Sequence, residues 1–294
     1  MARLVYLGSP EPAVEPLRAL LDAGHEVPLV VSQPDRRRGR GKDTSPTPVK
    51  AFAMERGIEV TDELERVNGL DVELAIVVAY GRLIPAAMLE TMPYLNVHFS
   101  LLPRWRGAAP VERAILAGDA ETGVAIMQLE EALDTGPVYA TSSTLVGEAT
   151  SADLLERLSV MGGELLVSLL ASGVAGLPEP VAQVGEPTYA AKLKAEDFLL
   201  APNLSAVEMS RRVRLGRASL QVAGQRLRVH AAHLAEGEPD DVPGTLRGAA
   251  VCTGEGRLLL ELVQPEGRKP IDAADWLRGA RLDEVVHLDE PASR

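Results

Sequence analysis

The first half of the chain alternates short apolar runs with amphipathic stretches, and this alternation restricts the possible fold more than any other feature. The runs RLVYLGS, EVPLVVSQ and ELAIVVAY are almost continuously apolar, as strands buried on both faces are. Between such runs lie segments with helical spacing, among them PAVEPLRALLDAG and IPAAMLETM. Strands that alternate with helices indicate a parallel sheet covered on both faces, so the sequence predicts a doubly wound α/β domain.

A loop-like stretch follows the long helical segment SADLLERLSVMGGELLVSLLASG and marks the predicted end of this domain. It is rich in glycine and proline, which resist both helix and central strand. Beyond it, LSAVEMSRRVRLG has the pattern of a short helix, and SLQVAGQRLRVHAAHL, GTLRGAAVCTG and GRLLLELVQPEG have that of strands. We therefore expect a first domain over residues 1–177, a linker over 178–203 and a small antiparallel β-barrel over 204–294.

The ends of the predicted strands indicate where a ligand would bind. Open parallel sheets bind ligands beyond the carboxyl ends of their strands, which here are Ser32-Gln33, Tyr80-Gly81 and Phe99-Ser100. The turn after the first strand reads Gly8-Ser9-Pro10-Glu11-Pro12, which lacks the G-x-G-x-x-G spacing that brings backbone against a pyrophosphate. A nicotinamide cofactor is therefore not expected.

Polar side chains alternate along the strand-like run from Leu95 to Ser100. A period of two places Asn96, His98 and Ser100 on one side and Val97 and Phe99 on the other. An isolated Asn-x-His often satisfies only nearby backbone groups, but this pair has a distinctive context. The motifs around it are Ser100-Leu101-Leu102-Pro103, Trp105-Arg106-Gly107 and, after the next strand, Leu133-Asp134-Thr135-Gly136.

Taken together, these motifs resemble the core of the methionyl-tRNA formyltransferase family, within the wider group of formyltetrahydrofolate-dependent transferases. Further matches are Gln33-Pro34-Asp35-Arg36, Gly39-Arg40-Gly41-Lys42, Val77-Val78-Ala79-Tyr80-Gly81 and Tyr189-Ala190-Ala191-Lys192-Leu193. The resemblance implies a Rossmann-like first domain, an oligonucleotide-binding (OB)-like barrel, and 10-formyltetrahydrofolate as formyl donor. It implies that Asn96, His98 and Asp134 are catalytic. The folate contacts that it implies are Tyr80, Gly81, Ser100, Leu101, Leu102, Pro103, Thr135 and Gly136.

The chemistry of formyl transfer independently supports the catalytic assignment. When an amine attacks a formamide carbon, the carbonyl oxygen becomes an oxyanion that needs preorganised donors, and the Asn96 amide and a protonated His98 are suitable. The amine must lose a proton and the folate nitrogen must leave, which is acid–base work within the range of imidazole. Asp134 near His98 would favour imidazolium, fix the orientation of the ring, or accept a proton through water. We expect direct transfer through a tetrahedral intermediate, without a covalent enzyme adduct.

Two other interpretations of this set are weaker. A metal site needs several converging ligands, but the remaining histidines, His25, His230, His233 and His287, show no ligand spacing, and Cys252 is the only cysteine. No metal is expected. Ser100 lacks the G-x-S-x-G elbow of a hydrolase nucleophile, so a hydrolase triad is not expected either.

The formyl acceptor is indicated by basic clusters within an acidic chain. The net charge of −12 argues against a uniformly basic nucleic-acid-binding surface. The loop QPDRRRGRGK nevertheless carries five basic residues against one acid, either as a solvated loop or as a grip on a tRNA acceptor end. The resemblance implies that Arg40 contacts the acceptor stem of methionyl-initiator tRNA. The predicted tRNA-binding residues are Arg36, Arg38, Arg40, Lys42, Arg211 and Arg214.

Two departures from the family pattern and two alternatives remain. Position 99 is Phe where relatives usually have a small residue, and a shorter Arg-Leu-Gly-Arg-Ala-Ser replaces the aromatic- and proline-rich segment expected after the first C-terminal helix. An amino-sugar nucleotide could be the acceptor instead, although the basic loop argues against it. A noncatalytic tRNA-binding or folate-binding protein is the other alternative. No obligatory protein partner is indicated.

The N-terminus MARLVYLGSPEP lacks the long apolar run and the cleavage site of a signal peptide. No stretch reaches the roughly 20 apolar residues of a membrane span. The sequence therefore predicts a cytoplasmic protein that does not bind membranes.

Overall fold

The computed structural model describes residues 1–37 and 44–289. It divides into two compact units. The first comprises Met1–Val111, Glu121–Leu145 and Leu154–Ala191, and the second comprises Glu112–Ala120, Val146–Asp153 and Lys192–Arg294. The predicted linker borders at residues 178 and 203 stay predictions, and residues 178–191 group with the first unit.

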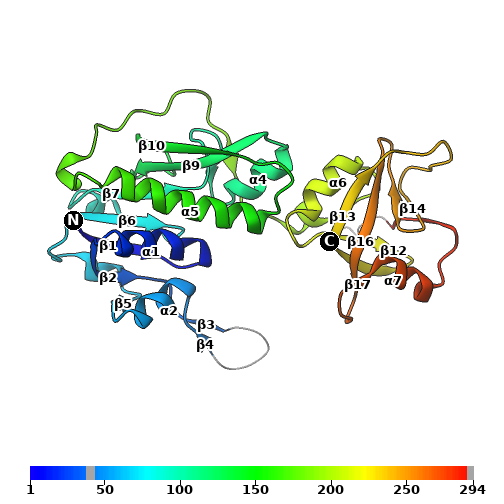
Figure 1. The fold of residues 1–294 in the computed structure, drawn as a ribbon, viewed down its shortest axis with the longest axis horizontal. Coiled ribbons are helices and arrows are strands. Elements are labelled where there is room, and N and C mark those ends of the chain that lie inside the picture. The colour runs from blue at the N-terminus through cyan, green and yellow to red at the C-terminus, as the bar shows by residue number, and fades with distance from the viewer. Residues whose placement is uncertain (38–43, 290–294) are drawn as a thin grey trace. The chain divides into compact units, whose positions relative to one another are not determined.

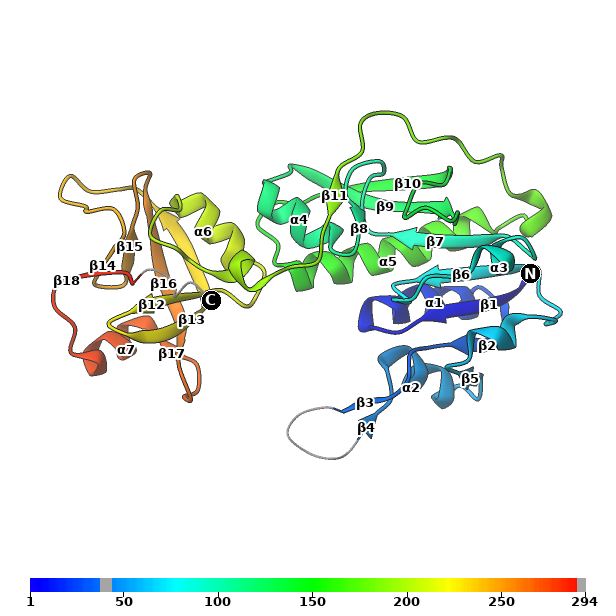
Figure 2. The ribbon, with the colours of Figure 1, turned by 180° about the vertical axis from the view of Figure 1, so that it is seen from behind.

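A seven-stranded sheet forms the centre of the first unit, in the order β10-β9-β7-β6-β1-β2-β5 (Figure 2). The strands β7, β6, β1, β2 and β5 run parallel, whereas β9 runs antiparallel to both β7 and β10. The predicted doubly wound, Rossmann-like α/β fold is confirmed, with the difference that the sheet is mixed at one edge. The strand bounds are β1 Arg3–Gly8, β2 Glu26–Val31, β5 Glu59–Thr61, β6 Leu74–Val78, β7 Tyr94–His98, β9 Glu121–Gln128 and β10 Val138–Leu145.

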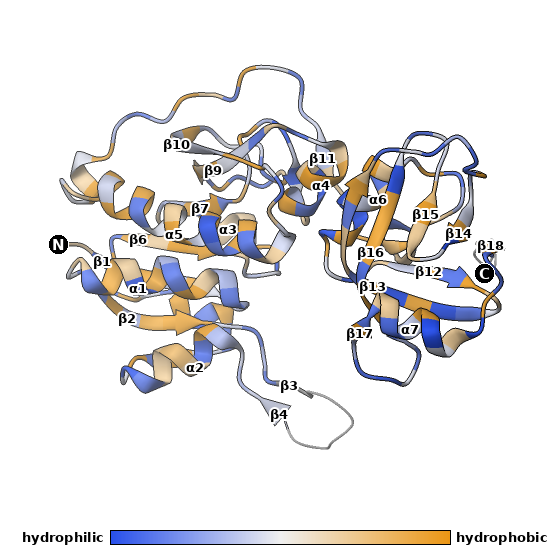
Figure 3. Cartoon of the chain, turned by 45° about the vertical axis from the view of Figure 1, so that its right-hand side comes forward, coloured by the Kyte–Doolittle hydropathy of each residue, from blue (hydrophilic) through white to orange (hydrophobic). Residues whose placement is uncertain are grey.

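Helices cover both faces of this sheet. On one face α1 (Val14–Asp22) and α5 (Ser151–Leu169) pack together (Figure 1). Their contact is so close that a Cβ on Gly163 would lie only 2.9 Å from the Cβ of Ala19. The other face carries a buried cluster that includes Val5 and Val77 and is covered by α3 (Ala86–Leu89) and the 3-10 helix Leu64–Val67. Figure 3 shows β2 and β6 as mainly hydrophobic, as strands covered on both faces should be.

Shorter elements complete the first unit. Strands β3 (Arg36–Arg37) and β4 (Thr44–Ser45) pair after β2, and α2 (Pro48–Glu55) begins at Thr47, whose hydroxyl accepts a hydrogen bond from the Lys50 amide. Strand β8 (Arg106–Gly107) pairs with β11 (Tyr189–Ala190). The remaining 3-10 helices of this unit are Glu11–Ala13 and Val174–Gly176.

The second unit contains an antiparallel barrel with strand order β12-β13-β16-β15-β14-β18, and β17 pairs with β16. A bridge between Val222 and Leu288 and a 2.9 Å hydrogen bond from the Asp289 amide to the Gln221 carbonyl join the two outer strands. The predicted small β-barrel is confirmed. Its strands are β12 Ser219–Val222, β13 Gln225–Ala235, β14 Thr245–Arg247, β15 Ala250–Cys252, β16 Arg257–Pro265, β17 Ile271–Asp272 and β18 Val285–His287.

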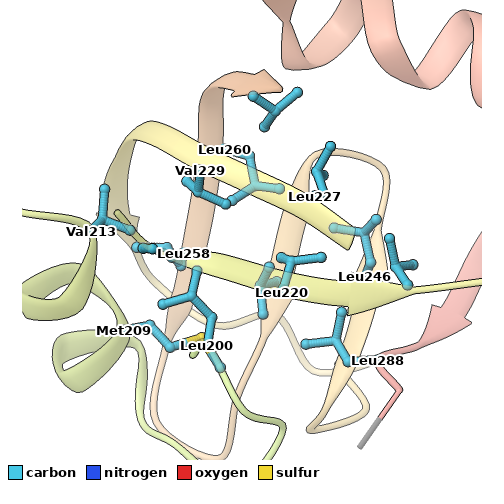
Figure 4. Packing of buried hydrophobic residues seen from close by; sticks show 14 of the residues in the cluster. Leu200, Met209, Val213, Leu220, Leu227, Val229, Leu246, Leu258, Leu260 and Leu288 are labelled. Carbon is cyan, nitrogen blue, oxygen red and sulfur yellow. The ribbon is translucent and has the colours of Figure 1, made fainter. Parts of the chain in front are cut away.

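Inward-facing aliphatic side chains fill this barrel. Leu220, Leu227, Val229 and Leu258 are buried in one cluster that Met209 of α6 closes (Figure 4). The helices of this unit are α4 (Pro110–Ala117, which begins in the first unit), α6 (Ala206–Val213), α7 (Ala273–Ala280) and the 3-10 helix Ala195–Phe198. Among the described residues, no helix combines the length and the apolar character needed to cross a membrane.

Candidate active site

The predicted catalytic strand, β7, lies inside the sheet with its carboxyl end at the predicted binding edge. Asn96 lies opposite Val77 of the parallel strand β6 and opposite Met127 of the antiparallel strand β9. Tyr94 belongs to the cluster under α3, and the strand period places Asn96 and His98 on that same face. The alternation predicted from the sequence is therefore present in the fold.

The Asn96 side chain is half-buried, and its amide makes no hydrogen bond to the residues that the structure describes. A polar group that is largely buried normally has a partner. An amide in this state is available to a ligand, as a donor through its NH₂ group and an acceptor through its oxygen.

His98 is held between a backbone carbonyl and a carboxylate. Its Nε2 lies 2.9 Å from the Trp105 carbonyl oxygen, and since a carbonyl can only accept, Nε2 carries the proton of this bond. Its Nδ1 lies 3.8 Å from Oδ2 of Asp134, and both side chains are more than nine-tenths buried. This distance is too long for a direct hydrogen bond, so the carboxylate acts on the ring through its charge. The structure thus brings His98 and Asp134 together.

Left-handed backbone positions the groups around His98. Trp105 has φ 63° and Asp134 has φ 52°, a conformation that costs a non-glycine residue about 1–2 kcal/mol. The amide of Gly107 donates a 2.8 Å hydrogen bond to Asp134 Oδ2. Gly107 itself has φ 117°, and a Cβ there would lie 2.9 Å from the Ala190 carbonyl oxygen, so glycine is required.

The sequence interpretation missed these backbone groups. The carbonyl of Trp105 and the amide of Gly107 belong to the Trp-Arg-Gly motif, which the sequence singled out only as context. Backbone groups leave no direct signal in side-chain patterns, apart from the glycine that their conformation demands.

The residues after β7 form a tight turn. Ser100 is fully buried, and its hydroxyl donates a 2.6 Å hydrogen bond to the Arg104 carbonyl. The Arg104 amide in turn donates to the Leu101 carbonyl at 3.1 Å, and the Leu102–Pro103 peptide is cis. The hydroxyl of Ser100 therefore stabilises the turn, whereas Leu101, Leu102 and Pro103 are half-buried and retain accessible surface.

The loop that carries Asp134 approaches β9 closely. A Cβ on Gly136 would lie 2.0 Å from the Gln128 carbonyl oxygen, which excludes any side chain there. The Thr135 hydroxyl donates to the Ala132 carbonyl at 3.1 Å and so closes the loop. Thr135 and Gly136 follow Asp134 directly in this loop, and their contact with folate stays a prediction.

A cavity of about 320 Å³ opens at the same edge of the sheet. Tyr80 and Gly81, which follow β6, line it together with Ser9, Gln33 and Thr47. The Gln33 side chain donates to the Tyr80 carbonyl at 3.2 Å, so two of the predicted strand ends meet here. The volume of this cavity lies within the range of small-molecule sites. Within the described ranges, no three His, Cys, Asp or Glu side chains are grouped to hold a metal ion.

Phe99 packs into the core on the side opposite His98. It is 7% exposed, and its Cε1 lies 3.8 Å from the position of a Cβ on Gly162, close to Val97. Gly162 belongs to α5, so the Phe99 ring lies between β7 and that helix. The aromatic ring fills space in the core and does not crowd the side of the strand that carries Asn96 and His98.

We therefore expect Phe99→Gly to lower the free energy of unfolding by about 3–5 kcal/mol without raising folate affinity. Urea unfolding measures the first quantity, and titration of folate measures the second. Phe99→Leu serves as the milder variant. A rise in folate affinity in either variant would mean that the ring obstructs the pocket.

The structure describes only part of the predicted tRNA-binding set. Arg38, Arg40 and Lys42 lie outside the described residues, and Arg36 is described through the backbone of β3 alone. In the second unit, Arg211 and Arg214 line a polar hollow of about 150 Å³. Arg214 is largely committed to the fold, since its Nε donates to the Ala149 carbonyl at 2.9 Å and burial lowers the pKa of its guanidinium.

Comparison with known proteins shows the family of the chain. The model of the formyl transferase family matches residues 2–170, and that of the formyl transferase C-terminal domain matches residues 192–281. Methionyl-tRNA formyltransferase of Halorhodospira halophila is 42% identical over 302 residues, covering 96% of this chain and 97% of that protein. The enzyme of the same name from Dinoroseobacter shibae is 43% identical over 300 residues, covering 96% and 100%.

The fold has counterparts among solved structures. An N-formyltransferase from Helicobacter canadensis, in complex with folinic acid and dTDP-3-aminofucose, superposes with a TM-score of 0.67 at 17% identity, covering 90% of this chain and 100% of that one. At such low identity, this likeness supports the fold alone. Full-length identity above 40% and the two matched domains carry the assignment: the chain belongs to the formyl transferase family, and within it to the methionyl-tRNA formyltransferases.

Proposed function

We propose that this enzyme transfers the formyl group of 10-formyltetrahydrofolate to the free amino group of methionyl-initiator tRNA. The product is N-formylmethionyl-tRNA, which serves translation initiation. The observation that carries the proposal is the arrangement of Asn96, His98 and Asp134 at one edge of the sheet, with His98 Nδ1 3.8 Å from the carboxylate. Sequence identity to methionyl-tRNA formyltransferases supports the choice of acceptor.

The reaction exchanges one carbon–nitrogen bond for another. The amine nitrogen attacks the formyl carbon, a tetrahedral intermediate forms, and the bond to the folate nitrogen then breaks. Negative charge develops on the formyl oxygen, where the Asn96 amide, which makes no hydrogen bond to any described residue, can donate one. No bond to the enzyme is needed, because the attacking and leaving nitrogens both belong to the substrates.

One proton must leave the amine and one must reach the folate nitrogen. The proton on Nε2 of His98 is hydrogen-bonded to the Trp105 carbonyl, so Nδ1 is the nitrogen that would exchange protons with the substrates. Asp134, buried beside it, stabilises the imidazolium that forms when Nδ1 takes up a proton. Neither side chain is consumed, so the pair is ready for the next turnover.

The folate is proposed to bind along the turn Leu101–Pro103, the loop Thr135–Gly136 and the strand end Tyr80–Gly81. These segments surround the end of β7, and Tyr80 and Gly81 line the 320 Å³ cavity. A flat heterocycle needs an apolar wall and a few backbone hydrogen bonds, which such loops provide. The Helicobacter canadensis protein of similar fold is described with folinic acid bound, which supports a folate as co-substrate.

The acceptor can be tested by offering two amines, charged initiator tRNA and an amino-sugar nucleotide, to the purified enzyme with 10-formyltetrahydrofolate. We expect formylation of charged initiator tRNA at a kcat/KM at least about 100-fold above that for an amino-sugar nucleotide, because the basic residues proposed to bind tRNA would add binding energy that a small acceptor lacks. Preferential formylation of the amino sugar would identify the alternative acceptor. A wild-type enzyme that binds folate and tRNA but formylates neither of the two amines would be a noncatalytic member of the family.

We expect binding of charged tRNA to weaken steeply as salt concentration rises, because contacts to the phosphate backbone release counterions. Arg40→Ala should raise KM for tRNA and reduce the slope of log Kd against log salt by about one, while folate affinity is unchanged. Fluorescence anisotropy at several salt concentrations measures the slope. Arg66→Ala, which removes a charge from a surface ion pair with Glu59, is the matched control. Loss of folate binding in Arg40→Ala would instead place this loop over the folate.

A further inference from the structure

The segment from Val181 to Ala190 crosses the active-site loops although it has almost no regular structure of its own. It forms a single bridge to Val138 and the two-residue strand β11. Most of its residues are exposed, and the inward-facing ones are Gln183, Thr188 and Ala190. These three contact the catalytic loops, so the segment has a more specific role than connecting two units.

Gln183 joins two active-site loops through its side-chain amide. Its Nε2 donates to the Asp134 carbonyl at 2.9 Å and to the Gly136 carbonyl at 2.8 Å. Its Oε1 accepts from Nη2 of Arg106 at 2.7 Å and from Nε of Arg106 at 3.1 Å. The amide therefore uses both donors and both acceptor positions, a complete pairing that fixes the orientation of the side chain.

Hydrogen bonds from this segment reach both residues of the site that have a left-handed backbone, Asp134 and Trp105. Asp134 has a left-handed backbone, and its carbonyl receives the Gln183 bond. Trp105 is also left-handed, and its amide donates to the Thr188 hydroxyl at 2.9 Å. Residues in such conformations persist where their surroundings hold them. One segment thus restrains both the residue that fixes His98 Nε2 and the residue that faces His98 Nδ1.

We propose that Gln183 is a positioning residue, which holds the Asp134 loop so that its carboxylate stays beside His98 and accepts the Gly107 amide. This inference rests on the proposed function, because it assigns Asp134 a part in formyl transfer. Gln183 touches no reacting atom. It acts through the Asp134 and Gly136 carbonyls on one side and the Arg106 guanidinium on the other.

Two substitutions distinguish a positioning role of Gln183 from a role in filling space. Gln183→Glu is nearly isosteric and can still accept from Arg106, but an ionised carboxylate cannot donate to the two carbonyls. Gln183→Ala removes all four hydrogen bonds. We expect both to lower kcat about 10- to 100-fold while KM for folate changes less than about threefold. Glu186→Ala, an exposed change in the same segment, is the matched control and should keep wild-type kcat.

A double-mutant cycle identifies the partner. If Gln183 acts through Asp134, Gln183→Ala should cause no further loss of single-turnover rate in an Asp134→Ala background. An equal fold-loss in both backgrounds would overturn the proposal, as would wild-type kcat in both Gln183 variants. The rates are compared per folded enzyme, with the thermal unfolding midpoint measured for each variant.

Hydrogen exchange at the Gly107 amide tests the positioning role of Gln183 without any formyl transfer. Its result therefore distinguishes failure of this inference from failure of the proposed function. The Gly107 amide donates to Asp134 Oδ2, so its hydrogen exchange reports whether the carboxylate is in place. We expect faster exchange at Gly107 in both Gln183 variants and unchanged exchange in Glu186→Ala. Unchanged exchange in the Gln183 variants would overturn the positioning role even if the wild type formylates tRNA. Faster exchange would support it even if the wild type does not.

Discussion

His98→Ala is expected to lower kcat for formyl transfer to charged tRNA by about 10²–10⁴-fold, because it removes the group proposed to move protons at the reacting nitrogens. The groups that contact the ring do not replace it: Oδ2 of Asp134, 3.8 Å from Nδ1, already accepts a hydrogen bond from the Gly107 amide, and Trp105 offers a backbone carbonyl, which can only accept. KM for folate should change little, since the proposed folate contacts lie on the adjoining loops. Steady-state kinetics at saturating tRNA measures both parameters.

The substitution also removes the hydrogen bond that His98 Nε2 donates to the Trp105 carbonyl, which costs about 1–3 kcal/mol of unfolding free energy. A second variant, His98→Gln, separates this effect, because its amide can donate to the carbonyl but cannot exchange protons near neutral pH. Both variants should lose activity, whereas His287→Ala, an exposed change in the second unit, should not. Substantial activity in His98→Gln would show that the ring serves only to hold the loop.

Asn96→Ala is expected to lower kcat by about 10²–10³-fold with little change in stability. The Asn96 amide makes no hydrogen bond to the described part of the chain, so its removal leaves no buried partner unsatisfied. Its proposed partner, the oxyanion, exists only during the reaction, so the loss should appear in kcat and hardly in KM.

Rapid-quench kinetics with saturating substrates and thermal unfolding measure these two effects. Asn68→Ala changes an exposed asparagine of the same unit and should match the wild type in both. A stability loss in Asn96→Ala that accounts for the whole loss of activity would contradict a role in the transition state.

The placement of the side chains on β7 could be predicted from the sequence because one simple periodicity determines it. The period of two put Asn96 and His98 on one side of their strand and Phe99 on the other, and the structure has Phe99 packed toward α5. The direction of β9 could not be predicted in the same way. Its residues 122–127 are all buried, and a buried apolar strand has the same pattern whether it runs parallel or antiparallel.

The precise geometry around His98 depends on interactions that leave little trace in composition. The hydroxyl of Ser100 donates to the Arg104 carbonyl, an interaction that the sequence does not indicate, and the contact of Ser100 with folate stays a prediction. Gln183 lies in a stretch rich in glycine and proline, which indicates a loop and gives no hint of its partners 49 and 77 residues away. Long-range hydrogen bonds of this kind follow from the tertiary fold, which local patterns do not encode.

The barrel illustrates the opposite case. Its strands are predicted individually from apolar runs between glycine-containing turns, and β13 turns alternate side chains such as Leu227 and Val229 into the barrel core. The ligand of this unit is implied only by the family resemblance, because the sequence indicates Arg211 and Arg214 only as members of a cluster of basic residues. Arg214 bonds the Ala149 carbonyl in the fold, and its part in tRNA binding stays a prediction.

Transfer of a labelled formyl carbon in a single turnover tests the account most directly. Enzyme in excess is mixed with 10-formyltetrahydrofolate labelled in the formyl group and with methionyl-initiator tRNA, and label on folate, protein and tRNA is followed over time. We expect label to pass from folate to the methionyl amino group without ever residing on the protein, and His98→Ala to leave it on the folate. Label on any side chain during turnover, or none reaching the methionyl amino group of the charged tRNA, would contradict direct transfer at Asn96, His98 and Asp134.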